Sequence, residues 1–385
     1  MRLLYYAFSY LDTDIANILI SKGIGIQTID RKFKDNNHDD SFVEWFEKNV
    51  DTSRFDCCFS VDYWPVISEL CQKHGLLYIA WSYDTPPNVK NIERTLGNDV
   101  NRVFWFDRTQ YRQYKDEGFD NVYHMPLGVN RVRMEALKAS PQQHAKYDTD
   151  ISLVGKLYDS DYQFLLSVMP EAYRSFFETL VDTQGKLFDR YIIDQMVTDR
   201  MAAEITACIA KDHPELKLNV PREALTYAAA SEVTKRERII LLTLCGKRYA
   251  TRLYSYQDNE IIQNVERMPA VDYLTEMPYV FQCSKINLNP AFCMIESGAS
   301  LRALDILGAG GFLLTRHQQE LTEMFKDGEE IVVYKDFGDA IDKVGYYMRN
   351  EEQREKIALN GRRKTLKQHS LQQRLDEIFK IAFGG

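Results

Sequence analysis

The sequence lacks the features that mark several large classes of protein. None of its apolar runs approaches the roughly 20 residues of a membrane-spanning helix, so we expect no membrane span. Its opening residues, MRLLYYAFSYLDTD, reach an aspartate after a short apolar run and contain no small-residue cleavage site, which favours a first strand over a signal peptide. The net charge of −8 argues against a nucleic-acid partner, because a non-specific nucleic-acid binder needs a basic face.

The cysteines also lack a recognisable pattern. The chain has seven cysteines, an odd number, and they show no metal-ligand spacing. Cys57 and Cys58 are adjacent, and a strand would point them to opposite faces. Reduced cysteines that serve in packing are typical of a cytoplasmic protein, and we expect this location.

Several motifs with known chemistry are missing. The sequence has no Walker phosphate loop, no HExxH metal motif and no serine elbow. Two Asp-Thr-Asp triplets, at 12–14 and 148–150, could hold a divalent cation bridged to a diphosphate. One triplet opens a helix-like segment, however, and the other precedes a strand. We therefore predict no metal site and no bound cofactor.

The length of 385 residues exceeds what one hydrophobic core usually serves, which favours two domains. In residues 1–145, short apolar runs such as RLLYYAFSY, FDCCFSVD and LLYIAWSYD alternate with helix-like segments. Continuous apolar runs suit strands that are buried on both faces, so this pattern predicts a doubly wound parallel sheet. Residues 146–360 form a second α/β domain by the same reasoning, with a helical insertion at about 160–235 and a final helical segment at 361–385.

The stretch ESGASLRALDILGAGGFLLT, residues 296–315, has two interpretations. Gly298, Ala299 and Ser300 precede a helical run, where free backbone N–H groups favour an anion. Arg302 in the first turn suits phosphate oxygens, and Asp305 one turn later could accept hydrogen bonds from a ribose. The alternative is a helix that stops at a glycine before a buried strand. Local chemistry leaves both open.

Two further strand ends carry residues that could act on a ligand. Gly155 and Lys156 directly follow the first strand of the second domain, and open α/β sheets bind ligands at such carboxyl ends. Asp84 follows a strand of the first domain and is a candidate general base, with an aspartate that caps a turn as the alternative. Asp107, after another strand, is expected to cap the next helix.

Long blocks of the chain resemble one known family. The segments SKINLNPAFCMIESGASLRALDILGAGGFLLTRHQQELTEMFKDGEEIVVYKD and EQREKIALNGRRKTLKQHSLQQRLDEIF resemble the CgeB-like (spore maturation protein type) glycosyltransferases. FDCCFSVDYWPVISELCQKHGLLYIAWSYDTPPN, VFWFDRTQYRQYKDEGFDNVYHMPLGVN and DISLVGKLYDS look like earlier blocks of that family. Together the blocks cover most of the chain outside the helical insertion.

The resemblance implies a GT-B fold, in which two Rossmann-like domains face each other across a cleft. It implies a hexosyltransferase-type activity that uses a nucleotide-diphosphate sugar, such as a UDP-sugar, as co-substrate. The second domain would hold the donor and the first an acceptor, which could be a glycan, a protein or a small molecule. The donor diphosphate would meet Gly298 to Arg302, the ribose would meet Asp305, and the base would lie near Tyr279 and Tyr254–Gln257. The final helix would cross back to the first domain.

One departure from the family pattern bears on the stereochemistry. Many retaining GT-B enzymes carry two glutamates eight residues apart around this loop, whereas this chain has Ser297 and Asp305 there, with Glu296 one residue off. We therefore favour inversion without a metal, in which Asp84 takes the acceptor proton and Lys156 and Arg302 stabilise the leaving diphosphate.

Three other functions fit parts of the pattern. The main alternative is a non-catalytic module that binds a nucleotide sugar or a glycan on the same fold. An NAD-dependent enzyme would need a glycine fingerprint after a strand, and a sugar epimerase would need acid–base pairs without an acceptor site. The helical insertion is a candidate for an acceptor site, a partner surface or a homodimer contact.

Overall fold

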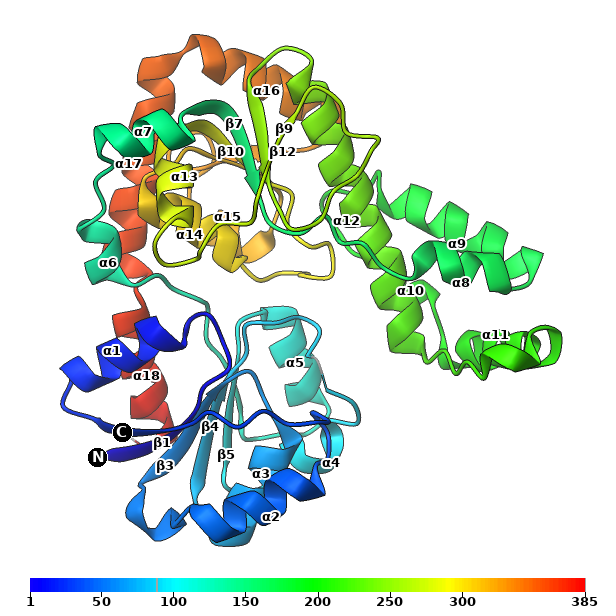
Figure 1. Cartoon of the computed structure of the whole chain (residues 1–385), viewed down its shortest axis with the longest axis vertical. Helices are drawn as coiled ribbons and strands as arrows, with labels where there is room; N and C mark the ends of the chain where they lie inside the picture. The colour runs from blue at the N-terminus through cyan, green and yellow to red at the C-terminus, as the bar shows by residue number, and fades with distance from the viewer. Residues whose placement is uncertain (88, 385) are drawn as a thin grey trace. The chain divides into compact units, whose positions relative to one another are not determined.

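The computed structural model describes residues 1–87 and 89–384. They divide into two compact units, which are coloured along the chain in Figure 1. The first unit comprises Met1–Ala136, Ser297–Leu304 and Thr365–Gly385, and the second comprises Leu137–Glu296 and Asp305–Lys364.

The first unit contains a six-stranded parallel sheet in the order β2-β1-β3-β4-β5-β6. Cys57 in β3 pairs with Leu3 in β1 and Leu77 in β4, and every residue of β3 is buried. The continuous apolar runs of the sequence thus become strands covered on both faces, and the doubly wound prediction is confirmed. The strands are β1 Arg2–Tyr6, β2 Gly25–Ile29, β3 Cys57–Val61, β4 Leu77–Trp81, β5 Asn101–Trp105 and β6 Val122–His124.

Local sequence signals set the limits of the first unit's helices. Pro65 occupies the first turn of α3, and Gly75, with φ 64°, ends it in the left-handed conformation that glycine tolerates. Asp39 caps α2 through the N–H of Phe42. The helices are α1 Asp12–Ser21, α2 Asp40–Asn49, the 3-10 turn Thr52–Arg54, α3 Pro65–His74, α4 Glu93–Leu96, α5 Arg108–Asp116 and α6 Arg131–Glu135.

The last helix, α18 (Leu371–Ala382), is counted with the first unit. Ser370 starts it with a capping box, and its backbone bridges to Val129. A Cβ added at Gly128 would lie 2.9 Å from the Ser370 carbonyl carbon, so the two backbones approach as closely as a glycine allows.

The second unit contains another six-stranded parallel sheet, in the order β12-β11-β10-β7-β8-β9. The sequence did not predict β9, because its three residues are mostly exposed and show no apolar pattern. The strands are β7 Thr149–Val154, β8 Thr251–Tyr254, β9 Glu266–Met268, β10 Ser284–Asn289, β11 Leu313–Arg316 and β12 Val332–Tyr334.

The helical insertion of the second unit is organised by α12, which has 25 residues. Residues of its first half, including Ala229 and Val233, pack with Phe177 and Ile205 of the insertion's own core. Leu241 and Leu242 of its second half pack against the sheet. Figure 1 shows α8, α9 and α11 beside the first half of α12. The insertion comprises α8 Tyr162–Val168, α9 Glu171–Gln184, α10 Ile193–Met196, α11 Asp199–Asp212, the 3-10 turn Pro214–Leu216 and α12 Arg222–Gly246.

The remaining helices complete the layers around the second sheet. They are α7 Pro141–Tyr147, α13 Met277–Cys283, α14 Leu301–Ala309, α15 Gln319–Met324, α16 Phe337–Arg349 and α17 Glu351–Gln368. Helices α14 and α17 each contain residues counted with both units. None of the helices in the described ranges combines the length and the apolar character needed to cross a membrane.

The division into units differs in detail from the one expected from the sequence. The expected boundary lay between residues 145 and 146, whereas the second unit begins at Leu137. Helix α7 packs with α13, and the N–H of Ala139 donates to Gln282 Oε1 at 2.7 Å, so this polar segment is part of the second unit. The tail joins the first unit from Thr365, close to the expected residue 361. All seven cysteines are free, and Cys208 alone among them is not fully buried.

Candidate active site

The loop before α14 has the geometry of a helix start. The carbonyl oxygen of Ser300 accepts the N–H groups of Ala303 and Leu304 at 3.1 and 3.4 Å, which places Ser300 at the N-cap. Gly298, Ala299 and Ser300 are buried, whereas Arg302 is partly exposed. The helix continues through Gly308 to Ala309, and Gly310, with φ 87°, follows it directly. The glycine that ends the helix is the one in the left-handed conformation.

Asp107 contacts this loop within the first unit. As expected from the sequence, it caps the following helix, α5, by accepting the N–H of Thr109 at 2.9 Å. Its carboxylate also accepts the Ser297 hydroxyl at 2.7 Å and the N–H groups of Ser297 and Gly298 at 3.2 Å each. The sequence did not reveal this second role, because Ser297 is 190 residues away along the chain.

The need for glycine at 298 also has a local cause. A Cβ added at Gly298 would lie 2.9 Å from a ring carbon of Phe106 and 3.1 Å from the Asp107 Cα. The sequence attributed this glycine to the approach of a diphosphate, whereas the described close neighbour is the end of β5 in the first unit. The glycine is therefore required by packing whether or not a ligand binds.

Asp305 in α14 is 2% exposed and accepts a hydrogen bond from the Tyr273 hydroxyl at 3.0 Å, within the second unit. The hydroxyl fixes one carboxylate oxygen of a residue that the sequence singled out for ribose binding. Tyr273 itself was missed, because it lies in a loop without a helix or strand pattern. Its position is defined only once the loop after β9 folds back to α14.

Arg238 of α12 joins the loop after β7 to the end of β10. Its guanidinium donates to the carbonyl of Lys156 and, at 2.9 Å, to the carbonyl of Pro290. Gly155 has φ 139°, a left-handed conformation, and a Cβ there would lie 3.3 Å from the Arg238 guanidinium. The guanidinium carbon also lies 4.8 Å from the centre of the Tyr158 ring, and Lys156 Nζ lies at the same distance from that ring. The predicted Gly155–Lys156 turn is thus held by an arginine that the sequence did not indicate.

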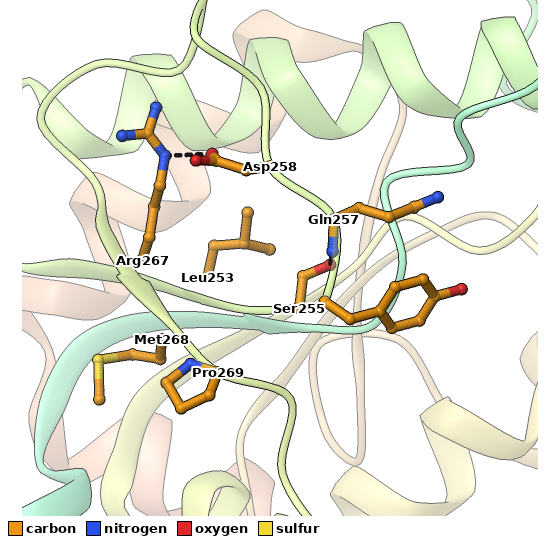
Figure 2. Close-up of a pocket in the computed structure, with 8 residues that line it drawn as sticks. Leu253, Ser255, Gln257, Asp258, Arg267, Met268 and Pro269 are labelled. Carbon is orange, nitrogen blue, oxygen red and sulfur yellow. Dashed lines mark hydrogen bonds and ion pairs between the residues drawn. The ribbon is translucent and has the colours of Figure 1, made fainter.

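A groove of about 240 Å³ opens at the carboxyl ends of β8 and β9 (Figure 2). The Arg267 guanidinium points to the Asp258 carboxylate and forms an ion pair with it. The backbone N–H of Gln257 donates to Ser255 Oγ at 2.9 Å. The side-chain oxygen of Gln257 accepts the N–H of Tyr158 at 3.0 Å. The groove is lined by Leu253, Ser255, Tyr256, Gln257, Asp258, Arg267, Met268 and Pro269.

This groove coincides with part of the base-binding region expected from the resemblance. It contains Ser255 to Gln257, which follow Tyr254. Tyr254 is 2% exposed and packs 6.4 Å from Tyr147, ring centre to ring centre, so its ring belongs to the core. Tyr279 lies in α13, outside the residues that line the groove. The polar side chains and backbone after β8 and β9, not the two tyrosine rings, form the surface available here.

Asp84 lies in the first unit, exposed, after the end of β4. Its carbonyl accepts the Ser82 hydroxyl at 3.0 Å. The N–H groups of Tyr83 and Asp84 donate to Asp62 Oδ1 at 2.7 and 3.1 Å, so Asp62 is the aspartate that binds the backbone of this turn. Burial raises the pKa of Asp62 to about 7, and the neighbouring Asp84 carboxylate acts in the same direction. The sequence missed Asp62, which follows a different strand.

The four aspartates of the two Asp-Thr-Asp triplets bind separate partners. Asp12 accepts the Tyr5 hydroxyl at 2.7 Å, Asp14 pairs with Arg133 at 2.6 Å, and Asp150 pairs with Lys285 at 2.8 Å. Asp148 contacts His144 at 2.8 Å, and these two residues with Cys283 offer ligand atoms within 4.8 Å of one another. This group lies near the starts of β7 and β10, at the opposite edge of the sheet from the groove.

Part of the chain matches a family of known proteins. Residues 222–380 match a family model described as glycosyl transferase-like. No curated protein matches the chain. Solved structures similar over the whole chain include sucrose-phosphate synthase from Thermosynechococcus elongatus, with a TM-score of 0.59, 9% identity and coverage of 100% of this chain and 99% of that one.

Two other similar structures agree on the fold. Anabaena HepE in complex with UDP and glucose has a TM-score of 0.58 and 9% identity, with 100% of both chains covered. A glycosyltransferase from Rickettsia africae has a TM-score of 0.54 and 10% identity, with 100% of this chain and 98% of that one covered. The two parallel six-stranded sheets with flanking helices are therefore those of the GT-B fold. Residues 222–380 thus resemble glycosyl transferases in sequence, and the whole chain shares the fold of these structures.

Proposed function

We propose that the protein transfers a sugar from a nucleotide-diphosphate donor to an acceptor hydroxyl, and that it is of the CgeB-like type. The main support for donor binding is that the segment matching the glycosyl transferase-like family contains the candidate donor-binding residues. Residues 222–380 contain the groove after β8 and β9, the Tyr273–Asp305 pair and all of α14. Because the similar HepE structure is a complex with UDP and glucose, UDP-sugars are the first donors to test.

The proposed donor contacts follow from the chemistry of each residue. The groove from Ser255 to Pro269 offers backbone and polar side-chain groups for the flat edge of a base. Asp305, fixed by Tyr273, accepts hydrogen bonds from the ribose hydroxyls. Lys156 and Arg302 meet the diphosphate with positive charge, as the N–H groups at the start of α14 do. With these groups neutralising the phosphates, the reaction needs no metal ion.

The proposed chemistry is inverting. The Asp84 carboxylate removes the proton from an acceptor hydroxyl as the oxygen attacks the anomeric carbon. The bond from that carbon to the diphosphate breaks, and Lys156 and Arg302 stabilise the charge on the departing group. The hydroxyl of Ser297, where many retaining enzymes have a glutamate, donates to Asp107, which supports a reaction without a carboxylate from that position.

The acceptor and the assembly state are predictions of the same proposal. The acceptor is a glycan, a protein or a small molecule that presents a hydroxyl group. The helical insertion at about 160–235 is the segment we expect to shape acceptor choice or a homodimer contact, because it has its own core beside the sheet domain. The expected cytoplasmic location also stays a prediction.

Donor binding is tested with UDP-, GDP-, dTDP- and CMP-sugars in a thermal-shift series, because a ligand that binds only the folded state raises the melting temperature. We expect sugars of one nucleotide class to raise the melting temperature of the protein. Asp305→Asn should weaken that donor about 10- to 100-fold through loss of a charged hydrogen-bond acceptor.

Asp342→Asn, at an exposed aspartate of α16 in the same unit, is the matched control and should bind normally. A shift with no nucleotide sugar, or equal affinities for both variants, would contradict the donor assignment. Donor binding without transfer or hydrolysis would instead indicate the non-catalytic binding module.

A further inference from the structure

Asp62 has an unusual backbone at a strand end. It follows β3 directly and has φ 60°, in the left-handed region that residues other than glycine seldom adopt, although aspartate and asparagine tolerate it better than most. Its N–H donates to the Trp81 carbonyl at 2.9 Å, and its own carbonyl accepts the Ser60 hydroxyl at 2.6 Å. The surrounding strands therefore hold this conformation, as strained residues at functional sites are held.

This backbone turns the Asp62 side chain toward the end of β4. One oxygen, Oδ1, accepts the N–H groups of both Tyr83 and Asp84, at 2.7 and 3.1 Å. The Asp62 side chain thereby fixes the backbone from which the Asp84 side chain departs. Trp81, which ends β4, is fully buried and packs edge-on against Tyr83 with ring centres 5.0 Å apart, so the strand end is held from its other side as well.

Other acidic groups of the first unit surround Asp62. The negative charge of Asp84 and, more weakly, that of Asp12 at the start of α1 raise the pKa of Asp62. The Asp12 carboxylate itself accepts a hydrogen bond from the Tyr5 hydroxyl. Desolvation is the largest influence and raises the pKa of Asp62 to about 7, while the hydrogen bonds from Tyr83 and Asp84 lower it. The geometry thus places two carboxyl groups at the ends of neighbouring strands.

We propose that Asp62 is the positioning residue of the base: its side chain holds the backbone at Asp84 in place, and its charge acts on the Asp84 carboxylate. The inference rests on the proposed function, in which Asp84 takes the acceptor proton. The acceptor O–H bond breaks, its proton goes to Asp84, and the new bond to the anomeric carbon forms as the bond to the diphosphate breaks. Asp62 neither gains nor loses a proton in this step.

A specific pH dependence follows. In mildly acidic solution Asp62 is neutral. As the pH rises through about 7, Asp62 ionises and places a second negative charge beside Asp84. A like charge favours the protonated form of its neighbour, so Asp84 becomes the stronger base. The transfer rate should therefore rise across neutral pH.

The substitution Asp62→Asn tests the charge of Asp62 separately from its hydrogen bonds to the backbone. Asparagine keeps an oxygen that can accept the two N–H groups and tolerates the left-handed backbone, but it cannot ionise. We expect kcat/KM of the unaltered enzyme to rise by about 3- to 10-fold from pH 6 to pH 8, and the Asn variant to lose this rise while it remains folded. Asp12→Asn, which alters the weaker neighbour, should keep most of it. An unchanged rise in Asp62→Asn would overturn the inference.

Carboxyl-carbon NMR of aspartate-labelled protein gives a readout that does not depend on turnover. The Asp62 signal, assigned by its loss in Asp62→Asn, should titrate near pH 7, and its midpoint should fall in Asp84→Asn. Titration near the ordinary value of about 4 would overturn the inference and leave the proposed function standing. Coupled titration in a protein that transfers no sugar would instead locate the failure in the proposed function.

Discussion

At the scale of single residues, Asp107 connects secondary structure to the candidate site. Its buried carboxylate caps α5 and also accepts one hydroxyl and two N–H groups from Ser297 and Gly298. Those N–H groups lie just before α14, where the sequence led us to expect a bound anion. In the structure a carboxylate of the protein accepts them, so any phosphate at α14 would have to use N–H groups nearer to Arg302 or replace Asp107.

Asp107→Ala should reduce the free energy of unfolding by about 2–4 kcal/mol. The change removes a helix cap, worth about 1 kcal/mol, and leaves buried donors without their acceptor, at about 1–3 kcal/mol. Urea unfolding measures the loss. Asp116→Ala, at the exposed far end of the same helix, should cost little, and equal losses in the two variants would contradict the role assigned to Asp107.

The residues that the sequence missed share a physical reason. Asp62, Asp107, Arg238 and Tyr273 act through partners in other segments of the chain. Their residue types are ordinary for their local segments, and nothing in the local pattern distinguishes them from solvated or capping residues. Only the folding of the whole chain brings their partners within hydrogen-bond distance.

At the scale of elements, long buried strands and helices could be predicted because their apolar patterns are continuous. β3 is buried along its whole length, and its run of apolar residues indicated this. β9 could not be predicted, because its exposed Glu266 and Arg267 resemble a loop and its pairing with β8 supplies the strand. The sequence placed the end of α14 at its glycines but did not decide between them, because only the backbone conformation at Gly310 shows which glycine stops the helix.

The contact of α12 with the loop after β7 gives a prediction at this scale. Arg238→Met should lower the free energy of unfolding by about 2–4 kcal/mol, because the buried carbonyl of Pro290 and the partly buried carbonyl of Lys156 lose a charged donor. Arg236→Met, two residues away, removes only partly exposed ion pairs with Asp182 and Glu232 and should cost less than about 1 kcal/mol. Thermal and urea unfolding compare the two variants. A larger loss in Arg236→Met would contradict this account of the turn.

At the scale of the whole molecule, the two-sheet architecture followed from chain length, strand patterns and the family resemblance together. The sequence could not show that the helical insertion has its own core, because the apolar face of a helix does not reveal which element it packs against. It also could not show that Ser297–Leu304 is counted with the first unit, because that depends on Asp107 and Phe106 far away in the chain. Each missed feature depends on contacts distant in sequence.

The central claim is that this chain transfers a sugar from a nucleotide-diphosphate donor with Asp84 as the base. Phosphorus NMR of the protein incubated with a binding nucleotide sugar and a mixed set of hydroxyl acceptors tests it most directly, since transfer or hydrolysis releases the nucleoside diphosphate. The account predicts release by the unaltered protein and a decrease of about 100-fold or more in Asp84→Asn, with donor affinity retained. Release at an unchanged rate by a folded Asp84→Asn, or none from any nucleotide sugar that binds the unaltered protein, would contradict it.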